Sequence, residues 1–168
     1  GNGKDLSMFS DGSMDAVFSS HFLEHVERSE VPAVLREWSR VIKVGGYLVL
    51  YIPSGNLYPR IGEPGANPDH KWDPMPGDVE SILKDQTLCF CALGGWELIE
   101  SEERSGTNEY SVFIVARKTE NGWTENLRQR NPDGKKRALV IRYGAIGDAV
   151  IASSVLPGLQ AQGYHVTY

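Results

Sequence analysis

The sequence predicts an α/β protein, with an open, mostly parallel sheet that ends in an antiparallel strand, followed by the first strand–helix–strand step of a second α/β unit. Three observations indicate this class. Short apolar runs alternate with segments of helical periodicity over residues 15–52. Two strand-like runs, 96–99 and 110–116, enclose a polar, hairpin-like segment. The alternation restarts at residue 137, after a polar stretch with several turn signals.

The first part of the chain predicts two strands separated by helices. A buried strand is expected over 15–20, with a helix directly after it. A second helix is expected to begin at Ser29, a suitable N-cap, because apolar residues recur after it at the spacing of one helical face. Gly45-Gly46 would end that helix as a left-handed C-cap. Residues 47–52 are apolar throughout, which is typical of a parallel strand covered on both faces.

The remaining elements divide the chain into domains. A loop rich in proline and glycine follows over 54–77, and long loops of this kind are usually functional or mobile. A short helix is expected from Asp78, before the final strands. We therefore predict a first domain over 1–117, a polar linker over 118–136, and the beginning of a second domain over 137–168.

Composition narrows the functional class. The 168 residues carry a net charge of −5, unlike the basic surface of a general nucleic-acid-binding protein. No apolar run approaches the roughly 20 residues that cross a bilayer. Cys89 and Cys91 are too few for a disulfide framework, so we expect a cytoplasmic, reduced protein. Because the chain starts at Gly1 and stops at Tyr168 inside an expected strand, we also expect it to be a fragment of a longer protein.

Several motifs occur in a recognisable order over residues 1–118. They are residues 5–25, which include Phe-Ser-Ser-His-Phe-Leu-Glu-His, residues 35–50, which include Arg-Val-Ile-Lys-Val-Gly-Gly, His70-Lys-Trp72 and Gly94-Gly-Trp-Glu-Leu-Ile99. In this order they resemble class I S-adenosylmethionine-dependent methyltransferases of the small-molecule type. The resemblance implies a Rossmann-like sheet, S-adenosylmethionine as cofactor and a small-molecule or saccharide acceptor.

The resemblance also implies which residues form the site. Ligands of open α/β sheets bind beyond the carboxyl ends of the strands, and residues 19–21 lie at such an end. Methyl transfer mainly requires alignment of the acceptor with the methyl group, so His21 and His70 are only candidates to orient or deprotonate it. Asn2 stands where the family commonly has an Asp that accepts from the adenine amino group. The cofactor residues implied are Asn2, Gly3, Leu6, Ser19, Ser20 and His21.

One part of the family pattern is missing. The glycine-rich cofactor loop after the first strand, and the acidic residue that binds the ribose hydroxyls, have no counterpart before residue 15. We therefore expect the chain by itself to bind the cofactor poorly. An alternative function is a degenerate methyltransferase fold that acts in partner binding without catalysis.

A metal motif coincides with the same segment. His21-Phe-Leu-Glu-His25 matches the H-x-x-E-H zinc motif of inverted metalloproteases, in which two histidines four residues apart share one helix face. A third ligand on a neighbouring helix is not evident, and the same residues fall within the methyltransferase pattern. We therefore assign no metal site.

The C-terminal segment has a resemblance of its own. Residues 136–157, with the loop Gly144-Ala-Ile-Gly-Asp148, resemble the amino terminus of heptosyltransferase-like glycosyltransferases. The loop matches neither the dinucleotide fingerprint nor the P-loop. The resemblance implies that Asp148 is the general base that activates a sugar hydroxyl and that a nucleotide sugar is the donor. The alternative is that Asp148 only caps the following helix. We thus predict a methyltransferase fused to a glycosyltransferase.

Overall fold

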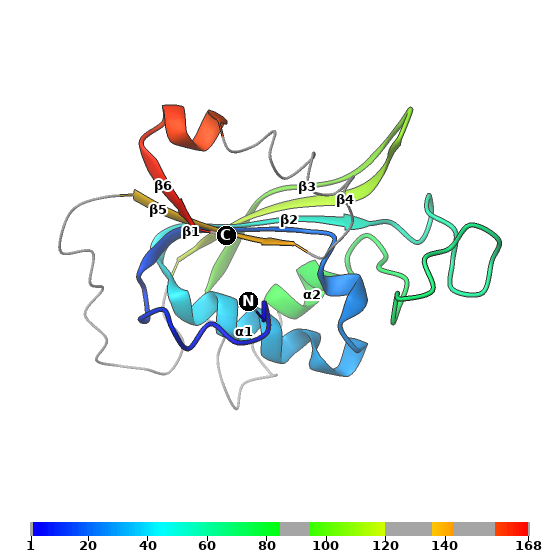
Figure 1. Ribbon diagram of the computed structural model, residues 1–168, viewed down its shortest axis with the longest axis horizontal. Helices are drawn as coiled ribbons and strands as arrows, with labels where there is room; N and C mark the ends of the chain where they lie inside the picture. Colours follow the sequence, from blue (N-terminus) through cyan, green and yellow to red (C-terminus); the bar gives the residue numbers. More distant parts are fainter. Residues whose placement is uncertain (1, 85–94, 120–135, 143–156, 168) are drawn as a thin grey trace.

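A computed structural model describes residues 2–84, 95–119, 136–142 and 157–167 (Figure 1). One sheet contains all the strands within these ranges. Two α-helices pack beneath it in the view of Figure 1, and a helical stretch at 157–161 lies above it. The strands are β1 (Met14–Ser20), β2 (Ile42–Pro53), β3 (Trp96–Gly106), β4 (Glu109–Lys118), β5 (Lys136–Arg142) and β6 (Tyr164–Thr167). The labelled helices are the short 3-10 helices η1 (Leu23–His25) and η2 (Arg28–Glu30) and the α-helices α1 (Val31–Val41) and α2 (Asp78–Lys84).

The strand order is β3-β4-β2-β1-β5-β6. β1 pairs in parallel with β2 and β5, and β5 pairs in parallel with β6. β4 runs antiparallel to both of its neighbours, β2 and β3. The predicted fold class, a mostly parallel sheet with a final antiparallel strand, is confirmed.

Helices α1 and α2 cover one face of the sheet (Figure 1). The apolar stripe of α1 places Val31, Leu35 and Trp38 against the strands, and all three are fully buried. Val79 and Leu83 of α2, the helix expected from Asp78, are buried in the same core. This packing fixes the carboxyl ends of β1 and β2 relative to each other.

Two predictions about the first helices are wrong. The segment after β1 forms the 3-10 helices η1 and η2 instead of one helix, and α1 begins at Val31 with no side-chain cap. Gly45 and Gly46 lie inside β2, where the pairing with β1 is irregular, instead of capping α1. Gly45 has a φ of 81°, and a Cβ at Gly46 would lie 2.7 Å from the carbonyl oxygen of Asp15. The glycines therefore allow a bulge and a close approach between strands.

The placement of the C-terminal strands also differs from expectation. Residues 137–168 are expected to begin a separate α/β unit, whereas β5 pairs with β1 over Ala16–Ser20 in the first sheet. The physical reason is that β1 would otherwise expose a row of backbone donors and acceptors, which β5 satisfies. The linker, 118–136, lies largely outside the described residues. Between β5 and β6 the structure describes a helical stretch at 157–161, in agreement with the expected strand–helix–strand order.

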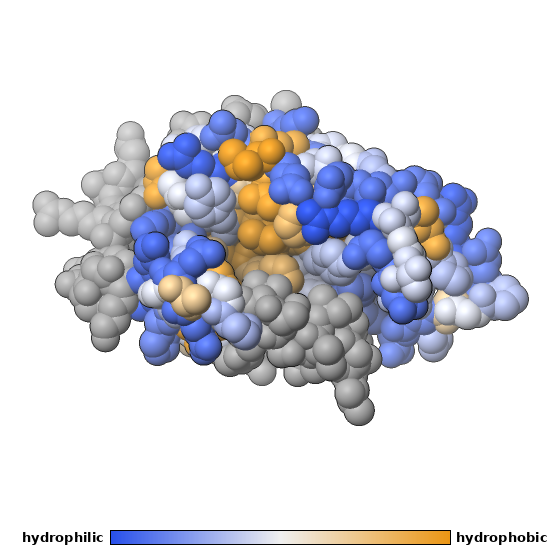
Figure 2. Space-filling view, turned by 90° about the horizontal axis from the view of Figure 1, so that it is seen from above, coloured by the Kyte–Doolittle hydropathy of each residue, from blue (hydrophilic) through white to orange (hydrophobic). Residues whose placement is uncertain are grey.

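The sheet face opposite α1 and α2 carries an apolar band (Figure 2). Phe18 is buried there, and Val49, Tyr51 and Val166 pack against it while remaining partly exposed. Within the described ranges, no helix combines the length and the apolar character needed to cross a membrane.

Candidate functional site

The carboxyl end of β1 brings three polar residues together. Ser19 and Ser20 are fully buried, and His21 is 7% exposed. Ser20 Oγ lies 3.0 Å from His21 Nδ1, and the His21 backbone N–H donates to the carbonyl oxygen of Tyr51 at 2.8 Å. His21 adopts a φ of 49°, which is uncommon for a residue with a side chain and recurs at functional sites. The structure thus holds the imidazole at the strand end through its backbone and its ring.

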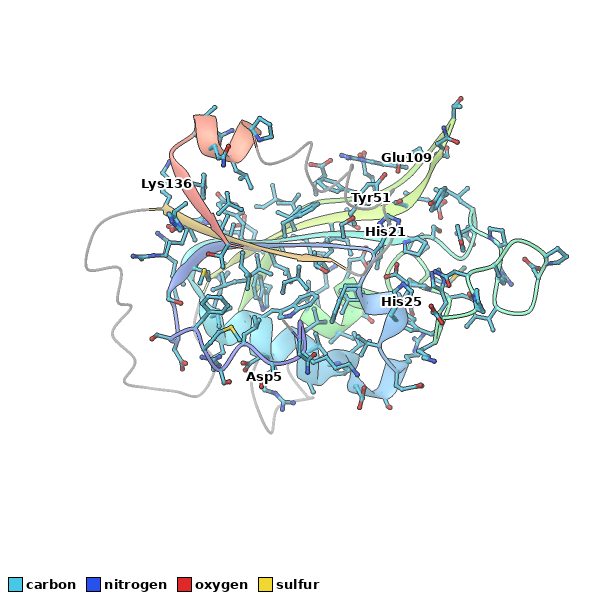
Figure 3. All side chains as sticks on the ribbon, in the orientation of Figure 1. Asp5, His21, His25, Tyr51, Glu109 and Lys136 are labelled. Carbon is cyan, nitrogen blue, oxygen red and sulfur yellow. The ribbon has the colours of Figure 1, made fainter. Side chains whose placement is uncertain are left out.

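A cluster of rings extends from His21 along this edge. His21 contacts Tyr51 and Tyr110, with ring centroids 5.5 and 6.2 Å apart. Tyr110 contacts Tyr58 at 5.0 Å, and Tyr58 contacts His70 at 5.3 Å. We call His21, Tyr51, Tyr58, His70 and Tyr110 the ring cluster. Figure 3 shows His21, His25 and Tyr51 at one end of the sheet, with Lys136 at the other.

Tyr51 supplies a hydroxyl donor to this edge. Burial raises the pKa of Tyr51, and the hydrogen bond from its hydroxyl to the Glu109 carboxylate raises the pKa further. The phenol therefore stays protonated at neutral pH and keeps the Glu109 carboxylate as its acceptor. β4 runs antiparallel to β2, so its first residues, Glu109 and Tyr110, meet the end of β2.

The loop over 54–77 is tied to the strand edge by specific hydrogen bonds. The Ser54 hydroxyl and the Asn56 amide both donate to the Glu103 carboxylate of β3. At the other end of the loop, Trp72 Nε1 donates to the carbonyl oxygen of Leu23 at 2.8 Å. These contacts hold Tyr58 and His70 next to the residues at the end of β1.

The three N-terminal residues predicted to bind the cofactor, Asn2, Gly3 and Leu6, differ in exposure and in what they contact. Asn2 is exposed, and its side-chain oxygen accepts from the Lys4 backbone N–H at 3.1 Å. Gly3 packs so closely that a Cβ would lie 2.7 Å from Ile141 and 2.8 Å from Phe22. Leu6 is 4% exposed and lies in the hydrophobic core. Gly3 therefore approaches the residue after His21, whereas the Leu6 side chain packs inward.

Some candidate residues cannot be placed. Asp148, with its glycine-containing loop, and the cysteine pair Cys89 and Cys91 lie outside the described residues. Sequence reasoning missed the three tyrosines of the ring cluster. Tyr51 could have been identified from the sequence, because it lies near the end of a predicted parallel strand, where ligands of such sheets bind.

Comparison with known proteins agrees with the fold. Residues 1–50 match the family model described as a methyltransferase domain. No curated protein matches the chain.

Several solved structures match a larger part of the chain than those 50 residues. A Methanosarcina mazei S-adenosylmethionine-dependent methyltransferase is 22% identical, with a TM-score of 0.48, and the match covers 72% of this chain and 66% of that one. A Mesorhizobium loti S-adenosylmethionine-dependent methyltransferase is 16% identical, with a TM-score of 0.52 and coverages of 70% and 67%. The cyclase SpnF is also 16% identical, with a TM-score of 0.52 and coverages of 72% and 55%.

The two structures with a TM-score of 0.52 show the fold. The chain has a Rossmann-like fold of the kind found in S-adenosylmethionine-dependent methyltransferases. It spans between about half and two thirds of the length of the solved structures compared. One of these structures is named as a cyclase, so the fold by itself does not determine the reaction.

Proposed function

We propose that this domain takes part in methyl transfer from S-adenosylmethionine to a small-molecule or saccharide acceptor. The observation that carries the proposal is the position of Ser19, Ser20 and His21. They lie within the segment that matches a methyltransferase domain, at the carboxyl end of a parallel strand. Ligands of open α/β sheets bind at that edge.

The residues at this edge fit a polar cofactor. Ser19 Oγ is buried and, within the described part of the chain, has no hydrogen-bond partner. A buried hydroxyl without a partner costs about 1–3 kcal/mol, so a bound polar group would remove a penalty that the protein otherwise carries. The small Gly3 lets the N-terminal segment approach Phe22, next to His21. When bound, S-adenosylmethionine supplies the electrophilic methyl group.

The protein would contribute mainly by aligning the acceptor with the methyl group of the cofactor. Ser20 contacts one ring nitrogen of His21, and the unusual backbone angle of His21 directs the ring toward Tyr51 and Tyr110. A fixed imidazole can orient a hydroxyl or amine acceptor or accept its proton. His21 is therefore the proposed positioning or acid–base residue, and the ring cluster is the proposed acceptor side.

Binding of S-adenosylhomocysteine tests the proposal. The coding sequence on both sides of residues 1–168 is read first, and binding is measured by titration calorimetry on the protein that the whole frame encodes. We expect micromolar binding, weakened about tenfold by Ser19→Val through lost space and a lost polar partner. Ser105→Ala, at an exposed serine of β3, is the control. Absence of binding would favour the alternative, a partner-binding module without catalysis.

The glycosyltransferase part of the prediction is a second proposal. It is supported by the resemblance of residues 136–157, in which Asp148 would activate a sugar hydroxyl. Asp148→Asn in the whole protein should abolish glycosyl transfer and leave methyl transfer intact. Loss of both activities would indicate that Asp148 serves the structure instead.

A further inference from the structure

A histidine from the proline-rich loop meets the Glu-His pair of η1. One ligand atom from each of Glu24, His25 and His70 lies within 4.8 Å of the others. The rings of His25 and His70 meet edge to face, with centroids 4.9 Å apart. Around a zinc ion with bonds near 2.1 Å, neighbouring ligand atoms lie roughly 3.4 Å apart, so small side-chain rotations would suffice to close this set on an ion.

The environment of these residues favours a cation. Glu24 is fully buried, His70 is 8% exposed, and the His25 side chain is 7% exposed. Glu24 Oε1 lies 3.9 Å from His25 Nε2, which is longer than a hydrogen bond. A carboxylate withdrawn from water is costly unless positive charge lies close to it. A divalent ion between the carboxylate and the two imidazoles would place further positive charge beside the carboxylate.

Two hydrogen bonds join the loop to η1 next to these three residues. The Lys71 backbone N–H donates to the carbonyl oxygen of Glu24 at 2.7 Å. Trp72 Nε1 donates to the carbonyl oxygen of Leu23 at 2.8 Å. Both donors directly follow His70 on the loop, and the two bonds reach η1 at Glu24 and the residue before it. The three proposed ligands therefore come from η1 and from the proline-rich loop. These two segments are far apart in sequence but are joined by hydrogen bonds.

We propose that Glu24, His25 and His70 bind one divalent transition-metal ion of the zinc type. Two imidazole nitrogens and one carboxylate oxygen are ligands that such ions prefer, and three protein ligands leave a position for an oxygen ligand, as in catalytic zinc sites. His70 also belongs to the ring cluster, so that position lies close to the proposed acceptor side. Metal binding itself does not depend on the proposed methyl transfer.

Metal titration of the purified protein tests the site. After treatment with a chelator, Zn²⁺ binding is measured by calorimetry and Co²⁺ binding by its visible absorption, in a Cys89→Ser, Cys91→Ser background that removes thiolate ligands. We expect one ion per chain. His70→Ala and Glu24→Gln should each weaken binding by more than about 100-fold, beyond the cost of losing a residue that only orients a ligand. His165→Ala, at an exposed histidine of β6, is the matched control.

Folding is monitored separately. Far-UV circular dichroism without metal reports whether each variant folds, and Glu24→Gln keeps the shape of the side chain while removing its charge. Weakened Zn²⁺ binding in folded His70→Ala and Glu24→Gln, with His165→Ala unchanged, would support the site. Absence of Zn²⁺ binding by the parent protein, binding that survives either substitution, or an equal loss in His165→Ala would overturn it.

Discussion

Lys118 provides a quantitative test of the packing between the sheet and α1. This last residue of β4 is 3% exposed, and its ammonium donates to the carbonyl oxygens of Ser39 and Ile42 at 2.7 and 2.8 Å. These carbonyls lie at the carboxyl end of α1, where a cation is favourable. Burial nevertheless lowers the pKa of Lys118 from its ordinary value of 10.5 to about 8.

The pKa shift predicts how the free energy of unfolding depends on pH. Between about pH 8 and 10.5 the unfolded chain holds a proton on Lys118 that the folded protein has released. The folded state therefore gains stability as the pH rises through this window. Integrating the two titrations gives a gain of about 2–3 kcal/mol between pH 7 and pH 10. With a urea m-value of about 2 kcal/mol/M, the midpoint shifts by about 1 M.

Lys118→Met isolates this contribution, because methionine fills a similar volume and does not titrate. Urea unfolding of both proteins is followed by circular dichroism at pH 7 and pH 10, so that the titration of all other groups cancels in the difference. We expect the parent protein to gain about 2–3 kcal/mol relative to the variant at the higher pH. Lys84→Met removes the same charge from an exposed position and is the control. A difference that is independent of pH would refute the reasoning.

Three further substitutions test the contacts that hold the N-terminal segment. Trp38→Phe removes the indole donor 2.7 Å from the Gly3 carbonyl oxygen and should lower the free energy of unfolding by about 1–3 kcal/mol in urea titrations. Gly3→Ala forces a methyl group against Phe22 and Ile141, so a loss of about 1–3 kcal/mol is expected, and an unchanged urea midpoint would contradict the close packing. Arg40→Met removes donors to two backbone carbonyls and two carboxylates, and thermal unfolding should show a loss of about 2 kcal/mol.

The sequence predicts the elements of the first sheet well, because local patterns encode them. The strands at 15–20 and 47–52 lie within β1 and β2, and the helix from Asp78 is α2. The prediction that Gly45 and Gly46 cap a helix is wrong, because both lie in β2, and the error has a physical reason. A glycine after a helical stretch has the same local signature whether it caps a helix or allows a bulge between strands. Only the pairing of β1 with β2 distinguishes these roles, and that pairing is not a local property.

The candidate site likewise contains residues that local sequence patterns predict and residues that they do not. The strand-end residues Ser19, Ser20 and His21 follow from the rule that ligands bind beyond the carboxyl ends of parallel strands, and their contact with a cofactor stays a prediction. The approach of His70 to η1 could not be predicted. It depends on where a loop of more than 20 residues returns to the sheet, and that path is set by single hydrogen bonds such as the one from Trp72 to Leu23.

The residues of the candidate site come partly from the ends of the strands and partly from the proline-rich loop, and this difference has a functional consequence. Ser19, Ser20 and His21 are held by a buried sheet, whose geometry is costly to change. Tyr58 and His70 sit on a loop that is anchored at a few points and can accept substitutions between them. In the proposed function, cofactor binding would therefore depend on the sheet edge, whereas the choice of acceptor would depend on the loop. Replacement of residues between the two anchored ends of the loop should then change acceptor preference before it changes affinity for S-adenosylhomocysteine.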